Sequence, residues 1–562
     1  MKFKDMPYER PNMDAFRSAM AACVLRIREA DDADAQIAAI DEAVALRREY
    51  TTMMSIAYVR YTVKTTDEFY AAEQDFFDEN QPLIQEIEEK LNDAMLDSRF
   101  RAALSEHYGS LVFTNLEIAR RSFKPELMEL MKEENKLQSD YQKLYAAITV
   151  EFDGQTMPLP MLGKYKESPD RAVRRAAFEV EGKAFDARRE TLDELFDKLV
   201  KNRNAQGRLM GYENYIPLGY DRLGRNCYTQ AEVAAFREQI ANDLVPIIAK
   251  VKEAQRKRIG VEKLCIYDND YRFPDGNAKP EGTPAEILAA AKSMYCALSP
   301  ETKAFIETMF DDELFDVLSQ DGKAPGGYCT MIPSYKVPFI FSNFNGTSDD
   351  VDVLTHEAGH AFAFYRAMRG GVNDMLMQAT IEACECHSMS MEFLTQDYHK
   401  DFFGKQTAKY ELAHCEASLD FIPYGCMVDE FQHLMYQNPD LSPEERNATW
   451  LKLEKKYRPW LDFDNLPFYS RGAHWQWKLH IYLYPLYYID YCMAATIAFQ
   501  VWMLSLKERE TAWKKYLSFV DAAGTKTFVD LCRDAGLRVP YESGCVAQIG
   551  AEISAWLASR QE

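Results

Sequence analysis

The sequence predicts a mainly α-helical protein with a small β-sheet. Ala, Leu, Glu, Arg and Lys recur at helical spacing over long stretches, and only short regions alternate β-branched and aromatic residues. A chain of 562 residues, 47% of them hydrophobic, can bury a large core in two or more subdomains. We therefore expect a multi-helical fold of more than one lobe.

The charge balance argues against two classes of partner. The chain carries 88 acidic and 66 basic residues, a formal net charge of −22. Nucleic acids and anionic membrane surfaces repel such a protein. We expect neither as a partner.

The sequence also indicates a location. Residues 1–7 contain no apolar segment of the kind that a signal peptide carries. The longest apolar stretch, roughly 491–506, is too short to span a membrane and includes Gln500. The twelve cysteines are mostly scattered singly and do not form a disulfide framework. We expect a cytoplasmic protein with reduced thiols.

The first third of the chain is predicted to be helical, with one interruption. Amphipathic spacing runs from residue 13 to about 147. At 147–157, β-branched and aromatic residues alternate around an Asp-Gly pair, which predicts a small β-hairpin. Ser168-Pro169-Asp170 then marks the start of one or two long helices. We place a domain boundary between residues 185 and 186.

The middle of the chain is predicted to contain the sheet. Helices are expected at 229–260 and 284–318, and strands at 326–333 and 336–347. Proline has no N–H to donate, so Pro338 favours an edge position for the second strand. An edge strand can hydrogen-bond an extended peptide. A purely structural hairpin that covers the next helix is an equally good interpretation.

Beyond the sheet the sequence is again helical. Helices are expected at 376–396 and 406–435, the second one broken at Pro423. An earlier helix directly after the strands carries the main motif of the chain. Acids at 349–352 favour its start and Gly370-Gly371 its end.

This motif is His356-Glu357-Ala358-Gly359-His360, an H-E-x-x-H sequence. Residues four apart on a helix share a face, so His356 and His360 can offer two imidazole nitrogens to one ion. Glu357 lies where it can hold a water molecule and take its proton. The alternative is that the two histidines lie on the protein surface and bind no metal. An apolar helix disfavours it, as does the scarcity of histidine, which makes a chance match about 0.01 per chain.

A catalytic zinc ion usually has three protein ligands, so a third is needed here. Glu382, Glu385 and Glu392 are available on the next long helix, and spacing alone does not choose among them. Cys384 and Cys386 would compete with Glu385, but their side chains diverge on a helix, which disfavours them.

Two further features have alternative interpretations. Asp352 either orients an imidazole or compensates the helix dipole. The segment from His480 to Tyr491 holds a histidine and five tyrosines in twelve residues. It is either a buried aromatic layer or a set of hydrogen-bond donors for a carbonyl oxygen that becomes negative during attack.

The motif at 356–360, followed by Glu385 to Glu392, resembles the oligoendopeptidase F and thimet oligopeptidase family of zinc metallopeptidases, with its Pz-peptidase-like branch closest. Segments 338–347, 480–491 and 203–228 are also similar to that family. The resemblance covers most of 110–550.

The resemblance implies a two-lobed fold with a deep substrate channel and an endopeptidase that hydrolyses short oligopeptides. With the boundary placed above, we expect an N-terminal helical domain at 1–185, which includes the hairpin near 148–157, and a catalytic domain at 186–562. The resemblance also implies roles for individual residues. These are zinc ligation by His356, His360 and Glu385, catalysis by Glu357, His480, Tyr488 and Tyr491, and substrate binding by Asn343, Phe344, Gly346 and Tyr484.

Some alternatives stay open at this point. The spacing after His480 is about one residue shorter than in thimet oligopeptidase, so the oxyanion donor is one of Tyr484, Tyr487, Tyr488 and Tyr491. A metallocarboxypeptidase and a non-catalytic protein that binds zinc or peptide are the competing functions.

Overall fold

The computed structural model describes residues 1–560 and confirms the predicted fold class. The chain is mainly α-helical, with two small sheets among these residues. No helix in this part of the chain is long and apolar enough to cross a membrane.

The described chain forms two compact units, each assembled from three segments. Unit 1 comprises Met1–Arg120, Lys279–Thr407 and Ile497–Leu537, and unit 2 comprises Arg121–Ala278, Ala408–Thr496 and Arg538–Glu562. The expected boundary between residues 185 and 186 lies inside a segment of unit 2, and the division into a helical and a catalytic domain at that point stays a prediction.

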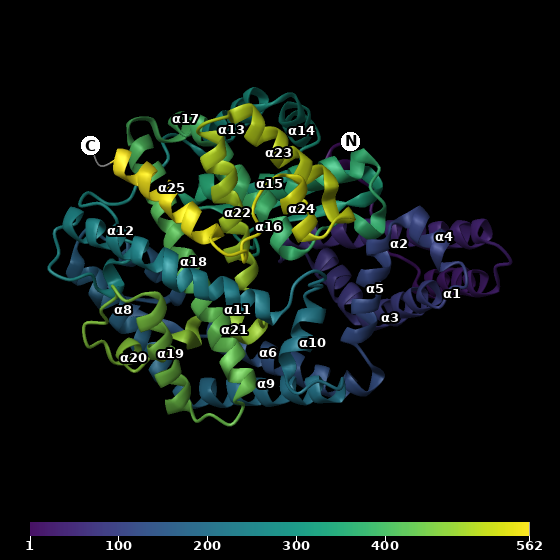
Figure 1. Ribbon diagram of the computed structural model, residues 1–562, viewed down its shortest axis with the longest axis horizontal. Coiled ribbons are helices and arrows are strands. Elements are labelled where there is room, and N and C mark those ends of the chain that lie inside the picture. Colours follow the sequence, from purple (N-terminus) through teal and green to yellow (C-terminus); the bar gives the residue numbers. More distant parts are fainter. Residues whose placement is uncertain (561–562) are drawn as a thin grey trace. The chain divides into compact units, whose positions relative to one another are not determined.

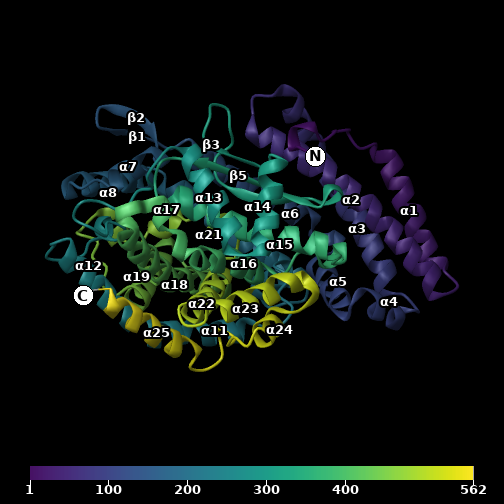
Figure 2. The same ribbon diagram turned by 90° about the horizontal axis from the view of Figure 1, so that it is seen from above.

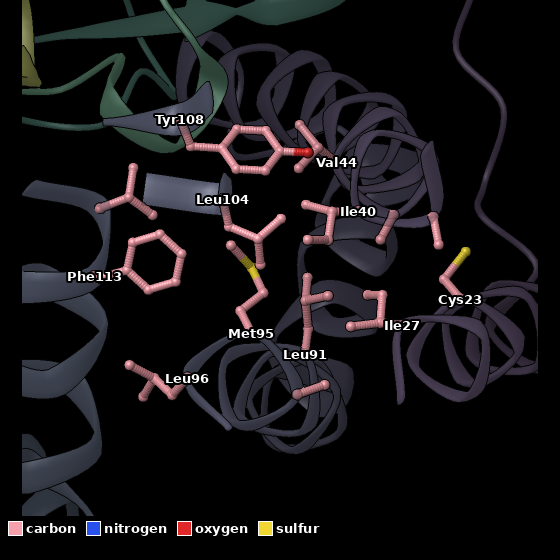
Figure 3. Close-up of a cluster of buried hydrophobic side chains, with 14 of the residues drawn as sticks. Cys23, Ile27, Ile40, Val44, Leu91, Met95, Leu96, Leu104, Tyr108 and Phe113 are labelled. Carbon is pink, nitrogen blue, oxygen red and sulfur yellow. The ribbon is translucent and has the colours of Figure 1, made fainter. Parts of the chain in front are cut away.

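Unit 1 begins with a helical bundle that builds its own core. In Figures 1 and 2 its long helices α1 to α3 lie side by side. Figure 3 shows Ile40, Leu91, Met95 and Leu104 meeting in one apolar cluster. Burial of each such side chain contributes about 1.5–3 kcal/mol. The bundle helices are α1 (Met13–Glu29), α2 (Ala33–Val63), α3 (Glu68–Leu96), α4 (Arg101–Tyr108) and α5 (Ser110–Ser122).

Short polar side chains explain where several of these helices start. Asn12, Asp32 and Asp67 accept hydrogen bonds from first-turn N–H groups of α1, α2 and α3. α13 (Pro284–Leu298) and α14 (Pro300–Asp311) begin with capping boxes at Thr283 and Ser299. Each such cap stabilises its helix by about 1 kcal/mol.

The sheet of unit 1 has the strand order β3-β5-β4. β5 (Val337–Phe344) pairs in parallel with β3 (Phe315–Leu318) and antiparallel with β4 (Tyr328–Ile332). Two predictions are therefore wrong: 315–318 is a strand, and the strand that contains Pro338 is central. β3 pairs with β5 only from Ile340 onward, so Pro338 pairs with β4 alone and interrupts no second ladder.

The helix that follows β5, α15 (Asp349–Gly370), starts and ends as predicted. Asp349, Asp350 and Asp352 lie in its first turn, and Gly371 closes it with a φ of 77°. α15 packs on β4 and β5 and on two helices, α16 (Ile381–Leu394) and α23 (Arg509–Ala522). α17 (Lys400–Phe403) and α24 (Phe528–Asp534) also belong to unit 1.

Unit 2 is helical apart from the predicted hairpin. β1 (Thr149–Phe152) and β2 (Gln155–Pro158) pair antiparallel, with Asp153 and Gly154 at the turn, which confirms that prediction. α22 (Ile489–Ser505) belongs to both units, because its residues up to Thr496 are in unit 2 and those from Ile497 are in unit 1. The other α-helices of unit 2 are α6 (Met128–Ala146), α7 (Gly163–Lys166), α8 (Arg171–Asp186), α9 (Arg189–Leu209), α10 (Tyr215–Arg222), α11 (Gln230–Gln239), α12 (Val245–Arg258), α18 (Thr407–Gln437), α19 (Pro443–Tyr457), α20 (Pro467–Ser470), α21 (Leu479–Leu483) and α25 (Cys545–Ser559).

The longest helix of unit 2 contradicts one prediction. α18 continues through Pro423 without a break. A proline inside a helix costs about 3 kcal/mol because it removes a backbone hydrogen bond. The buried side chains Leu419, Ile422, Val428 and Phe431 on either side of it offset that cost.

Candidate active site

The two histidines of the H-E-x-x-H motif are positioned by a backbone-to-backbone contact between α15 and α16, which Figure 1 shows next to each other. A Cβ atom placed on Gly359 would lie 2.6 Å from the carbonyl oxygen of His387 and 2.6 Å from Cα of Ser388. Any side chain would push the two backbones apart, so only glycine permits this approach. The contact brings α16 against the motif.

The three residues predicted to bind a metal converge there. Nε2 of His356 lies 3.4 Å from Oε2 of Glu385, and Nε2 of His360 lies 3.5 Å from the same oxygen. One donor atom from each residue lies within 4.8 Å of the other two. Two imidazole nitrogens and one carboxylate oxygen are a donor set of catalytic zinc sites, which leave a fourth position open. These residues fit a zinc ion.

The competing cysteines do not belong to that group. Sγ of Cys384 donates to the carbonyl oxygen of Ala379 at 3.5 Å, and burial raises the pKa of both Cys384 and Cys386. A thiol held in its protonated form is a poor metal ligand.

Glu392 contacts one of the predicted metal ligands, His356. Its Oε1 lies 2.6 Å from Nδ1 of His356, and only 14% of its side chain is exposed. A carboxylate on the second ring nitrogen fixes the orientation of an imidazole and leaves Nε2 free for an ion. Glu392 is therefore placed to orient His356.

The electrostatics of the group favour the carboxylate form of Glu385 and the protonated form of His356, which must give up a proton to bind a metal ion. Burial would raise the pKa of Glu385, but the hydrogen bonds and charges of His356 and His360 lower it well below its ordinary value. Burial would lower the pKa of His356, but Glu385 and Glu392 together raise it well above its ordinary value. Glu385 is thus a carboxylate, the form that binds a metal ion.

Glu357, between the two histidines, is half-buried. Burial raises its pKa, and the neighbouring His356 and His360 partly oppose that shift. A Cβ atom on Gly327 would lie 4.0 Å from Oε1 of Glu357, so the carboxylate faces the approach to β4 at a point without a side chain. A carboxylate whose pKa is raised is a stronger base than an exposed glutamate.

In unit 2, the His/Tyr segment is held at Leu486. The N–H of Leu486 donates to Oε1 of Gln432 (2.6 Å), and its carbonyl accepts from Nη2 of Arg225 (2.6 Å). Arg225 also pairs with the buried carboxylate of Asp490 at 2.8 Å. Leu486 has a φ of 66°, a left-handed conformation that leucine rarely adopts, and these bonds maintain it.

This turn sets the direction of the following tyrosines. Tyr488 is buried, with its ring centroid 4.8 Å from that of His480 and 5.8 Å from that of Tyr491. Burial raises the pKa of Tyr488 well above its ordinary value, so its hydroxyl stays protonated. Burial and the charge of Lys478 lower the pKa of His480 to about 4, which leaves its imidazole neutral at pH 7.

The residues predicted to bind substrate have mixed surroundings. Nδ2 of Asn343 donates to the carbonyl oxygens of Ala324 and Gly326, both at 2.9 Å. Phe344 is buried in β5, and the N–H of Gly346 donates to Asp350 at 2.8 Å. Tyr484 is 55% exposed. Substrate binding by these four residues stays a prediction.

Family models match most of the chain. The model of peptidase family M3 matches residues 164–551, and the model of the peptidase M3 N-terminal domain matches residues 3–123. The chain belongs to peptidase family M3. The predicted family is thereby confirmed, and with it, at the level of the family, the prediction of a peptidase.

Individual relatives are similar at different levels. The solved structure of Pz peptidase A with an inhibitor is 43% identical, with a TM-score of 0.93, and the alignment covers 100% of both chains. Oligopeptidase PepF of Bacillus subtilis (strain 168) is 22% identical over 68% of this chain, and an oligoendopeptidase F homolog of Lactococcus lactis subsp. lactis (strain IL1403) is 22% identical over 69%. The matches span 57% and 66% of those two relatives.

Sequence reasoning missed several residues that shape the candidate site. It gave no role of their own to Gly359, Gly327, Arg225 or Gln432. The two glycines allow a close approach of other atoms, and Arg225 and Gln432 hydrogen-bond a distant backbone group. Residue spacing in the sequence predicts neither kind of contact. Glu392 carried a signal, because it lies seven residues after Glu385 and so shares its helix face.

Replacing Gly359 by alanine tests the helix contact. We expect Gly359→Ala to lose zinc and to be destabilised by about 1–3 kcal/mol, because the added Cβ forces α16 away from the histidines. Metal analysis and denaturant unfolding measure the two effects. Gly370→Ala on the same helix is the matched control, since nothing lies within 4 Å of a Cβ there. Full zinc content in Gly359→Ala would contradict the argument.

Replacing Glu392 by glutamine tests the support of His356. We expect zinc affinity to fall by about 10- to 100-fold, because the imidazole loses the carboxylate that orients it. Competition with a metal indicator measures the affinity, and the circular dichroism spectrum should stay unchanged. An affinity equal to that of the unmodified protein would show that the 2.6 Å contact does not orient the ligand.

Proposed function

We propose that the chain is a zinc-dependent endopeptidase that hydrolyses internal peptide bonds of short oligopeptides. The observation that carries this proposal is the convergence of His356, His360 and Glu385 beside Glu357. The names of the relatives support the substrate class, because they are an oligopeptidase and an oligoendopeptidase F homolog.

His356, His360 and Glu385 would hold a single zinc ion. When bound, the ion supplies positive charge that lowers the pKa of water and polarises a peptide carbonyl. The open geometry of the three donors supports a catalytic ion, since structural zinc sites usually close with four protein ligands.

Glu357 acts as the general base in this proposal. Its carboxylate takes a proton from the attacking water and later gives it to the amine that leaves. The raised pKa of Glu357 supports both steps, because a stronger base accepts the proton more readily and remains able to release it.

Tyr488, with His480 or Tyr491, stabilises the carbonyl oxygen as it becomes negative. Each positioned donor lowers such a barrier by roughly 3–4 kcal/mol. The protonated hydroxyl of Tyr488 and the neutral ring of His480 support donor roles. Nδ1 of His480 has no protein hydrogen-bond partner among residues 1–560.

The strand order changes where a peptide backbone is expected to pair. β5 already pairs on both sides, whereas β4 has a second edge that pairs with no strand of the described chain. We propose that an extended peptide pairs with this edge of β4. Exposed Tyr484 in unit 2 stays a separate proposed contact for substrate. Asn343 would then act indirectly, by holding the carbonyls of Ala324 and Gly326 at the approach to β4.

A cytoplasmic location is part of the proposal. All twelve cysteines are free, and most of them are buried. Free thiols in such number are typical of a reducing compartment.

The Glu357→Gln variant tests the mechanism. We expect it to bind zinc as the unmodified protein does and to lose peptide hydrolysis by about 10²–10⁴-fold, because the amide cannot accept the proton. A quenched fluorescent peptide assay and metal analysis report the two properties separately. Undiminished hydrolysis would contradict the role of Glu357.

Blocking the end of the substrate separates an endopeptidase from a carboxypeptidase. We expect a peptide with an amidated C-terminus to be cleaved at the same internal bond and at a similar rate as the free acid, with products identified by mass spectrometry. Release of single C-terminal residues, abolished by amidation, would indicate a carboxypeptidase. One equivalent of bound zinc without any cleavage would indicate a protein that only binds.

A further inference from the structure

Lys478 is the residue directly before α21. It carries a positive charge without an acidic partner. Its Nζ donates to the hydroxyl oxygen of Tyr488 at 3.0 Å. Within the described chain, no carboxylate lies within ion-pair distance of this ammonium group, and its side chain is partly buried. Partial burial of a cation without a counter-ion costs hydration free energy that no opposite charge offsets.

Aromatic rings take the place of the missing carboxylate. Nζ of Lys478 lies 4.8 Å from the ring centroid of Trp477, 5.0 Å from that of Tyr488 and 5.2 Å from that of Tyr424. Each ring face attracts a cation by about 0.5–2 kcal/mol. These three rings hold the ammonium group in place, but they carry no negative charge that would neutralise it.

The hydrogen bond fixes how the hydroxyl of Tyr488 is used. An ammonium group can only donate, so the phenolic oxygen must accept. The phenol remains protonated, because burial raises its pKa well above its ordinary value. Its own hydrogen therefore points away from Lys478 and is free to donate to a second group. A cation on the oxygen also polarises the O–H bond and strengthens that donation.

We propose that Lys478 is a positioning residue that aims and polarises the hydroxyl of Tyr488 toward the negative oxygen of the transition state. The inference rests on the proposed role of Tyr488. Lys478 acts through that tyrosine and needs no contact with the peptide. The uncompensated charge is then useful, because it is offset only when the substrate oxygen becomes negative.

The surroundings of Lys478 also predict a dependence on pH. Burial, together with the charge of Arg458, lowers the pKa of Lys478 to about 8. Arg458 itself is paired with Glu454 at 2.5 Å. His480 is neutral at this pH, and Tyr424 is protonated because burial raises its pKa. Lys478 is therefore the group among these that loses a proton near pH 8.

The sign of the effect follows directly. Below about pH 8 the ammonium group is present and donates to Tyr488. As the pH rises through that value, the lysine becomes neutral and its polarising charge disappears. We expect kcat of the unmodified zinc enzyme to fall on the alkaline side with an apparent pKa near 8, while KM changes little.

Two substitutions test the proposal on the zinc-loaded full chain. Lys478→Met removes the charge and keeps the length, and we expect kcat to fall by about tenfold or more at pH 7 with little change in KM. Lys478→Arg keeps a charge that does not titrate below about pH 12. We expect this variant to retain most of the kcat and to lose the alkaline decline. A Lys478→Met variant with unchanged kcat, or a Lys478→Arg variant with an unchanged decline, would overturn the proposal.

Combining these substitutions with Tyr488→Phe separates this inference from the proposed function. In the Tyr488→Phe background, Lys478→Met should have no further effect on kcat, because the hydroxyl through which it acts is gone. An equal additional loss in that background would show a general structural role and contradict the inference. If Tyr488→Phe alone keeps full kcat, the proposed role of Tyr488 itself is wrong. If Tyr488→Phe loses activity but Lys478→Met does not, only the role of Lys478 is wrong.

Discussion

The close approach of α15 and α16 at Gly359 is the constraint on which the candidate metal centre depends. His356 and His360 share a face of α15 because of helix geometry alone, but Glu385 comes from a separate helix. The carbonyl oxygen of His387 lies only 2.6 Å from where a Cβ on Gly359 would be, and the hydroxyl of Tyr516 on α23 donates to that same oxygen at 2.9 Å. Three helices thus meet at one backbone group, and the positions of all three donors follow from that meeting.

How much was predictable depended on the range of the interaction. Helix periodicity, caps and the Asp-Gly turn are local, and from them the sequence predicted the mainly helical fold and the hairpin. The H-E-x-x-H motif is local as well. The choice of Glu385 over Glu382 and Glu392 as third ligand does not follow from local sequence, because three acids on one helix look alike. A family resemblance supplied that choice. In the structure, Glu385 is the acid that lies with His356 and His360.

The wrong predictions concern residues whose conformation depends on partners far away in the sequence. Pro338 and Pro423 were treated as local breakers, yet each lies where its missing N–H does little harm. β3 does not pair with Pro338, and α18 is buried on both sides of Pro423. The Leu486 turn was invisible for a related reason: its conformation is held by Arg225 and Gln432, which lie far away in sequence. Tertiary partners, absent from any sequence window, decided each case.

The contribution of α23 to the metal centre has a consequence for synthesis. α23 enters unit 1 from the last of its three segments, well after the histidines and Glu385 in chain order. At ribosomal rates of about 5–20 residues per second, the hairpin of α15 and α16 waits on the order of ten seconds for Tyr516 to be made. During that interval the His387 carbonyl lacks this support. A growing chain therefore completes the support of its candidate metal centre only after residue 516 has been made.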